Sequence, residues 1–149
     1  MASRVVEPET KKLDISQGDW LLVKKRLNAG EQRKMFARMY KAGVDGTLKV
    51  NTFEVRLAKI LTYLLDWSLI DTAGRQIRIA GQSTDEVTSA LDSIDPDSFG
   101  EIGAAIEEHI DTMTAERNAE KNDQAGETRS VAISPSRSAA DGQLMSSVN

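Results

Sequence analysis

Cysteine is absent from this chain, so disulfides, thiolate metal ligands and a cysteine nucleophile are all excluded. Aromatic residues are scarce at 5%, and there is a single histidine among the 149 residues. No apolar run is long enough to span a bilayer, and the first residues carry no apolar stretch typical of a secretory signal. These absences fit a reducing compartment and lead us to expect neither a leader nor a membrane segment.

Residue types that support catalysis or metal binding occur only in isolation. The single histidine, His109, lies beside Glu107 and Glu108, but Ala105 and Met113 stand four residues before and after it, and neither is a zinc ligand. No serine lies in a nucleophile elbow, and no glycine-rich loop matches a phosphate-binding motif. We therefore expect no enzymatic activity, no cofactor or metal and no small-molecule substrate, with His109 on the surface or in a helix seam.

The net charge of −4 is unevenly distributed along the chain. Residues 1–60 hold 13 Lys and Arg against 7 Asp and Glu, a net of +6, whereas residues 61–149 hold 6 against 16, a net of −10. Either a basic and an acidic face neutralise each other within one fold, or the separation serves a partner or a second copy of the chain. The sequence leaves both interpretations open.

More than half of the basic residues in the first half fall between positions 24 and 41. Such a set could bind phosphates, with Trp20, Phe36 and Tyr40 stacking on bases. Against nucleic acid, we expect these aromatics in the core, and a pI of about 5.1 is low for a dedicated nucleic-acid binder. We assign the basic residues to a protein partner, and the predicted partner-binding residues are Lys24, Lys25, Arg26, Arg33, Lys34 and Arg38.

The most apolar stretch, Val50–Asp71, predicts a central core helix that ends near Trp67. Its apolar residues recur at spacings of three and four, which places one broad apolar stripe on a helix. Asn51 or Thr52 can cap the N-terminus of this helix. The stripe consists of Phe53, Leu57, Ile60, Leu61, Leu64, Leu65 and Trp67.

A β-hairpin is predicted near the N-terminus. Leu13–Asp19 is typical of an extended piece with a turn at Gln17-Gly18, and Trp20–Val23 is rich enough in β-forming residues to be a strand that pairs with it. The competing interpretation is a helix that continues through Leu27, and an apolar run of this length does not decide between them.

Helices are also predicted on either side of the core helix. Asn28–Gly30 breaks the pattern, Glu31–Ala42 is predicted to be a helix, and Gly43–Thr47 a loop. After a short strand at Arg75–Ile79, a capping box at Ser83–Glu86 begins a helix that carries Val87, Ala90, Leu91 and Ile94. Asp95-Pro96-Asp97 begins the last helix, whose apolar seam is Phe99, Ile102, Ile106, Ile110 and Met113.

These elements predict an α+β fold that is mostly α-helical, with short N-terminal strands or a hairpin packed against three to four helices. We expect residues 1–12 to be flexible and residues 13–121 to form a single globular domain. Residues 122–149 are rich in Ser, Gly, Ala and Asp, and we expect them to be a disordered polar tail.

Three phrases of the sequence resemble a known family. They are GDWLLVKKRL at 18–27 followed by Gly30-Glu31, LTYLLDWSL at 61–69, and LDSIDPDSF at 91–99 leading into Ile106–His109. Together they make residues 11–122 similar to the tail assembly chaperones encoded by long-tailed bacteriophages (siphophages) of actinobacteria. The phrases concern the fold and contain no catalytic motif.

The resemblance implies a role rather than a reaction. Members of the family bind the long helical tape-measure protein, keep it soluble and help the major tail protein to polymerise around it, and in many of them a programmed frameshift adds a C-terminal domain to some copies. For this chain it implies a non-enzymatic assembly chaperone that acts in the host cytoplasm, is absent from the mature virion and has some capacity for self-association. The alternative is a structural tail or neck component of the virion, or a small nucleic-acid-binding accessory protein.

Overall fold

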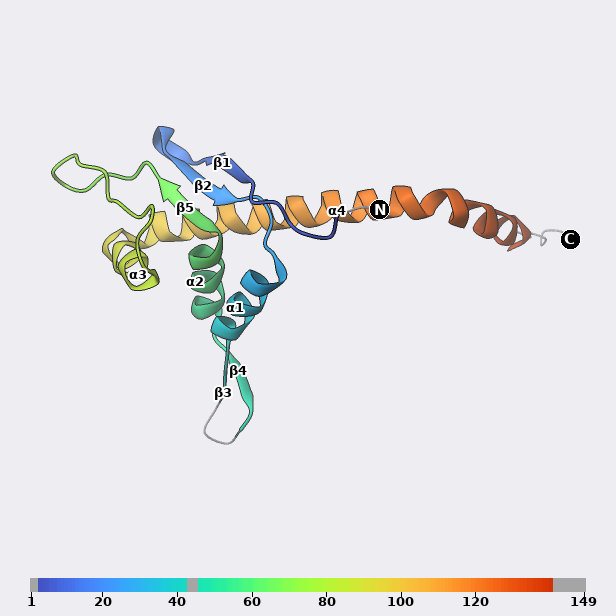
Figure 1. Ribbon diagram of the computed structural model, residues 1–149, viewed down its shortest axis with the longest axis horizontal. Coiled ribbons are helices and arrows are strands. Elements are labelled where there is room, and N and C mark those ends of the chain that lie inside the picture. The colour runs from blue at the N-terminus through green and yellow to red at the C-terminus, as the bar shows by residue number, and fades with distance from the viewer. Residues whose placement is uncertain (1–2, 43–45, 141–149) are drawn as a thin grey trace, which may run out of the picture. The chain divides into compact units, whose positions relative to one another are not determined.

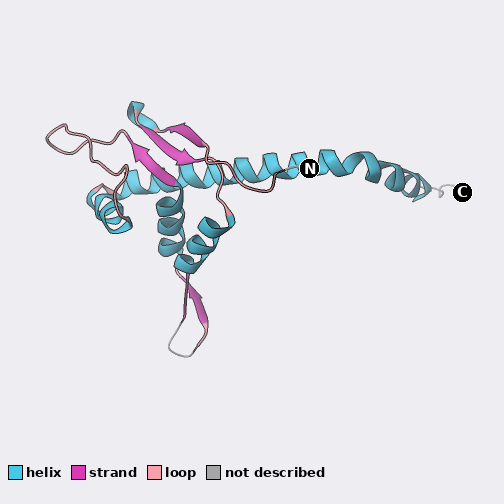
Figure 2. Ribbon diagram, viewed as in Figure 1, coloured by secondary structure: helices cyan, strands magenta, loops and turns pink. Residues whose placement is uncertain are grey.

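The computed structural model describes residues 3–42 and 46–140, with side chains described for residues 3–40 and 46–123. The chain divides into two units, Met1–Asp111 and Thr112–Asn149. Helices predominate and the strands are short, which confirms the predicted α+β class (Figures 1 and 2). The elements are β1 (Thr10–Asp14), β2 (Trp20–Lys24), α1 (Ala29–Met39), β3 (Tyr40–Ala42), β4 (Leu48–Val50), α2 (Thr52–Tyr63), β5 (Leu64–Trp67), α3 (Thr84–Ser93) and α4 (Pro96–Ala140).

The predicted N-terminal hairpin is confirmed. Strands β1 and β2 pair antiparallel, from Thr10 opposite Lys24 to Asp14 opposite Trp20. The turn between them needs left-handed backbone, and Gln17 (φ 61°) and Gly18 (φ 78°) supply it. Alternate residues of β2 are buried, as expected for a strand with one face on a core.

The predicted core helix is wrong in its last turn. Helix α2 begins as expected, with the Asn51 side chain accepting a hydrogen bond from the amide of Phe53 at 2.9 Å. It ends at Tyr63, and Leu64–Trp67 instead forms strand β5, which pairs with β2 and completes a three-stranded sheet in the order β1-β2-β5. Helical periodicity continues through this stretch, but pairing with β2 satisfies its backbone and buries Trp67 completely.

Helix α1 begins earlier and ends earlier than predicted. Asn28, expected to break the pattern, is the N-cap residue: its side chain accepts from the Glu31 amide at 2.9 Å, and the Glu31 carboxylate accepts from the Asn28 amide at 3.0 Å. At the other end, Tyr40–Ala42 leaves the helix as strand β3 and pairs with β4. Residues 43–45 of the predicted loop lie outside the described residues.

The strand predicted at Arg75–Ile79 is not present. This segment lies in the connection between β5 and α3 and makes one isolated bridge, between Ile70 and Gln76. Ile79 is nevertheless buried, and the Ile77 carbonyl accepts a hydrogen bond of 2.7 Å from the indole Nε1 of Trp67. The alternation of polar and apolar residues in this segment therefore belongs to a loop whose apolar side chains cover one edge of the core.

The two predicted helix starts in the second half are confirmed. Ser83 and Glu86 form the capping box of α3. Asp95 precedes α4 and accepts hydrogen bonds from the Ser98 amide (2.8 Å) and the Ser98 hydroxyl (2.7 Å), which lower the pKa of Asp95.

Helix α4 is described through Ala140, so its last part lies in residues 122–149, for which the sequence predicts a disordered polar tail. That prediction rests on low apolar content, and Gly126 and Pro135 in this segment have low helix propensity. Side chains after Asp123 and residues 141–149 lie outside the described part of the chain. Whether this segment is independent of the folded unit therefore stays a prediction.

One hydrophobic core joins the elements of the first unit. It takes side chains from the sheet, from α1, α2 and α3, and from the first turns of α4, where the predicted seam residues Ile102 and Ile106 are completely buried. Phe53 departs from the predicted stripe, because its side chain is 74% exposed and stacks on Phe99 with ring centroids 6.3 Å apart. The fully buried large side chains are Trp67, Leu21, Ile60, Leu91, Ile102, Ile106 and Val23.

Helices α2 and α4 meet where the Arg56 side chain lies across Gly103. A Cβ atom at Gly103 would stand 2.7 Å from Arg56 Nε and 2.8 Å from Arg56 Cγ. Arg56 Nη2 pairs with Glu107 at 3.0 Å, and Lys59 Nζ is 3.6 Å from the same carboxylate. The hydrogen bond from Arg56 lowers the pKa of Glu107, so this pair stabilises the fold at neutral pH and loses that contribution as the pH falls through the lowered pKa.

The contact at Gly103 predicts opposite effects for two glycine-to-alanine substitutions in α4. Gly103→Ala should lower the free energy of unfolding by about 1 kcal/mol, because displacing Arg56 outweighs the gain in helix propensity. Gly100→Ala is the matched control, since a Cβ there meets no atom within 4 Å, and it should raise the free energy of unfolding by roughly 0.5–1 kcal/mol. Urea denaturation of both variants measures these changes. Equal shifts in the same direction would contradict the packing of Arg56 on Gly103.

Candidate docking surface

A two-stranded ribbon, which we call the arm, extends from the ends of α1 and α2. It consists of β3 and β4, paired with Tyr40 opposite Val50 and Ala42 opposite Leu48. Figure 1 shows the arm leading away from the three-stranded sheet. Among the described residues β3 and β4 pair only with each other.

One face of the arm is apolar and exposed. Residues that face each other across an antiparallel pair lie on the same side of the ribbon, and so do residues two apart in a strand. Tyr40, Leu48 and Val50 therefore share one face, which we call the arm face, and they are 47%, 71% and 57% exposed. Phe36, one helical turn before Tyr40, is 45% exposed. The expectation that Phe36 and Tyr40 lie in the core is therefore wrong.

Exposed basic side chains occur on the same helix and strand that carry the exposed apolar residues. Lys49 is exposed on the opposite side of β4, and Arg33 and Lys34 are exposed on α1. None of the three forms an ion pair within 4.0 Å in the part of the chain that the structure describes, although the Lys34 charge also lowers the pKa of Glu31. Arg38 is partly buried and donates to the Thr84 hydroxyl at 3.4 Å. Positive charge is therefore exposed on α1, which leads into the arm, and on the reverse side of β4.

The basic residues predicted from the sequence divide into two groups. Arg33, Lys34 and Arg38 lie on α1, whereas Lys24, Lys25 and Arg26 lie at and after the end of β2. Three of these six predicted residues thus stand on the helix that leads into the arm. Their role in binding a partner stays a prediction.

The β2 group is partly neutralised by carboxylates. Lys24 pairs with Glu31, and Lys25 Nζ lies 3.4 Å from Glu9. Burial raises the pKa of Glu31, but the hydrogen bond from Lys24 and that from the Asn28 amide outweigh it, so that the pKa is lowered overall. The Lys24 and Lys25 charges are therefore less available to an acidic partner than those of Arg33 and Lys34.

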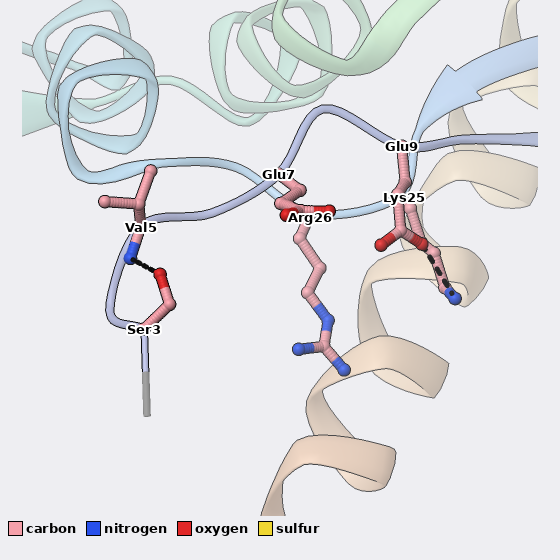
Figure 3. Close-up of a pocket in the computed structure, with 6 residues that line it drawn as sticks. All are labelled: Ser3, Val5, Glu7, Glu9, Lys25 and Arg26. Atoms are coloured by element: carbon pink, nitrogen blue, oxygen red, sulfur yellow. Dashed lines mark hydrogen bonds and ion pairs between the residues drawn. The ribbon is translucent and has the colours of Figure 1, made fainter. Parts of the chain in front are cut away.

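A hollow of about 330 Å³ lies between the N-terminal segment and the end of β2 (Figure 3). Its walls carry charges of both signs, and the ion pair between Lys25 and Glu9 crosses part of it. Paired charges leave little net attraction for an anion or a cation. Its lining residues are Ser3, Val5, Glu7, Glu9, Lys25 and Arg26.

His109 is a structural residue of the core rather than a surface residue. It is 2% exposed, its Nε2 lies 3.0 Å from the Lys24 carbonyl oxygen, and the Tyr63 ring meets it edge-on. Because a carbonyl only accepts, Nε2 carries the proton and donates, while Nδ1 has no hydrogen-bond partner. His109 thus connects α4 to the end of β2.

Within residues 3–40 and 46–123, whose side chains the structure describes, no three His, Asp or Glu side chains gather in a way that could hold a metal ion. In the same described residues no helix has the length and apolar content needed to cross a bilayer. Comparison of the chain with protein-family models, with curated proteins and with solved structures finds no match. The arm face is therefore the feature on which a functional argument rests.

Sequence reasoning missed the arm face, although a signal for it exists. Asp45-Gly46 is a dipeptide typical of tight hairpin turns, and the alternation of Leu48, Lys49 and Val50 that follows has the period of a strand. The competing signal was the helical pattern running through Tyr40, which indicated a helix up to the glycine at position 43.

Proposed function

We propose that this protein is a non-enzymatic tail assembly chaperone of a long-tailed bacteriophage. In this role it binds the tape-measure protein in the host cytoplasm, keeps it soluble and promotes assembly of the major tail protein around it. The protein itself leaves before the particle is complete. The resemblance of residues 11–122 to such chaperones supports the identity of the partner.

The exposed arm face is the observation that carries the proposal. The first unit has a complete core of its own, so Tyr40, Leu48 and Val50 are not needed to hold that core together. Burying apolar surface contributes about 25 cal/mol per Å², and each of these side chains has roughly half or more of its surface available for burial against a partner. Holding a long apolar chain reversibly requires a surface of this kind.

Co-expression with the tape-measure protein from the same genome tests the proposal. We expect that protein to be insoluble alone, soluble when this chain is present, and captured through an affinity tag on this chain. Because exposed charges steer association, capture should weaken between low and high salt. Equal solubility with and without this chain, combined with no capture at low salt, would overturn the proposed function.

A further inference from the structure

We infer that the arm face is the docking site for an amphipathic helix of the partner whose apolar stripe is flanked by acidic residues. The inference rests on the proposed function for the identity of the partner, the tape-measure protein. It adds to that function the surface that binds, the conformation that is bound and the sign of the partner's charge.

The uncovered state of the arm is the first reason. A two-stranded ribbon by itself is marginally stable in water, and three or more strands or packing against a helix are needed for independent stability. The arm pairs with no third strand among the described residues, and Tyr40, Leu48 and Val50 remain exposed. A helix laid on the arm face would supply the missing layer.

The dimensions of the apolar surface are the second reason. Three residues of a strand extend about 10 Å, and Phe36 adds one helical turn, about 5 Å, beyond Tyr40. An apolar stripe of about 15 Å matches two to three turns of a helix, which is the length over which residues i, i+3 or i+4, and i+7 face one side. The arm face therefore fits one helical segment.

Charge complementarity selects the chemistry of that helix. Lys49 lies on the opposite side of β4 and does not face this helix. The exposed basic residues of α1 are Arg33 and Lys34, and neither forms an ion pair within 4.0 Å among the described residues. Acidic residues beside the apolar stripe of the partner would meet them at the rim, where they steer encounter. The same charges disfavour a second copy as occupant, because a two-fold contact through the arm face would bring the two sets of basic residues together.

The first test replaces apolar residues of the arm face. It measures how much co-expressed tape-measure protein each variant captures. The variant Leu48→Thr/Val50→Thr removes apolar surface and places β-branched residues, which favour strands, at both positions of β4. We expect capture to fall at least about tenfold. The matched control is Ile70→Thr, because Ile70 is 62% exposed in the loop before α3, and its capture should equal that of the wild type. Circular dichroism and thermal melting confirm that both variants are folded.

Charge reversal of basic residues is the second test. Arg33→Glu/Lys34→Glu should weaken capture at low salt and flatten its dependence on salt. The control Lys11→Glu/Arg78→Glu makes the same change in net charge at two exposed positions outside the arm and should leave capture close to that of the wild type.

Site-directed crosslinking identifies the occupant, because the chain has no cysteine and a new one is unique. A thiol-coupled photocrosslinker at Leu48→Cys should label a segment of the tape-measure protein with apolar residues three and four apart and acidic neighbours. The same reagent at Ile70→Cys should label that protein weakly.

The outcomes separate the two proposals. If the wild type captures the tape-measure protein and the arm variants do so equally well, the docking site is overturned and the proposed function stands. If the wild type does not capture it, both are overturned. Crosslinks from position 48 to a second copy of this chain, or to a partner segment without helical apolar spacing, overturn the named occupant.

Discussion

Trp67→Ala is expected to lower the free energy of unfolding by about 4 kcal/mol, the largest effect of any substitution that we predict. Trp67 is completely buried in the core, where β5 completes the sheet, so alanine leaves a large cavity. Its indole Nε1 also donates to the Ile77 carbonyl at 2.7 Å, which holds the connection between β5 and α3 against the core. Domains of this size have a total stability of about 5–15 kcal/mol, so the variant should lose a large part of its stability and unfold at a clearly lower temperature.

Trp67→Phe is the control that separates packing from hydrogen bonding. Phenylalanine fills much of the volume but leaves the Ile77 carbonyl without its donor, and we expect a cost of about 2 kcal/mol. Urea denaturation followed by circular dichroism measures both variants. A change below about 1 kcal/mol for Trp67→Ala would show that Trp67 is not part of the core.

His109 is the second position at which a large effect is expected. Replacement by leucine fills the site with an apolar side chain but leaves the Lys24 carbonyl without its donor. It should lower the free energy of unfolding by about 2 kcal/mol. His109→Gln should cost less than half of that, because the amide Nε2 of glutamine is the same number of bonds from the backbone as the imidazole Nε2 and can donate to the same oxygen.

Thermal unfolding of the two His109 variants checks this account. A leucine variant at least as stable as the glutamine variant would contradict it. Burial of the side chain, and not the hydrogen bond to the Lys24 carbonyl, would then determine stability at this position. The comparison also tests whether the hydrogen bond between His109 and the Lys24 carbonyl stabilises the contact between α4 and β2.

Features set by local chemistry were predictable from the sequence. The turn at Gln17-Gly18, the capping box at Ser83 and the start of α4 at Pro96 each depend on a few adjacent residues, and all three are confirmed. The seam of α4 was predictable for the same reason, because its period of three and four lies within one helix.

Strand β5 could not be predicted in this way. Leu64, Leu65 and Trp67 continue the helical spacing of α2, so periodicity alone extends the helix. What decides the structure is pairing with β2, more than 40 residues earlier in the chain, where Leu21 lies opposite Trp67. Such a tertiary interaction overrides local propensity.

The candidate site was predicted only in part. Arg33 and Lys34 of α1, which the sequence predicts to bind a partner, are exposed, and that role stays a prediction. Phe36 and Tyr40, expected in the core, are exposed as well. Apolar residues on a helix indicate that one face is buried, yet they do not show whether the covering element belongs to the same chain. The same limit applies to Leu48 and Val50.

Quantitative mass spectrometry of purified virions and of infected cells tests the central claim most directly. A chaperone that leaves before assembly is complete should be abundant in infected cells while tails form, and absent from purified particles in which the major tail protein and the tape-measure protein are readily detected. Recovery of this chain from the particles in a fixed ratio to the tape-measure protein would contradict the account and identify it as a structural component of the tail or neck.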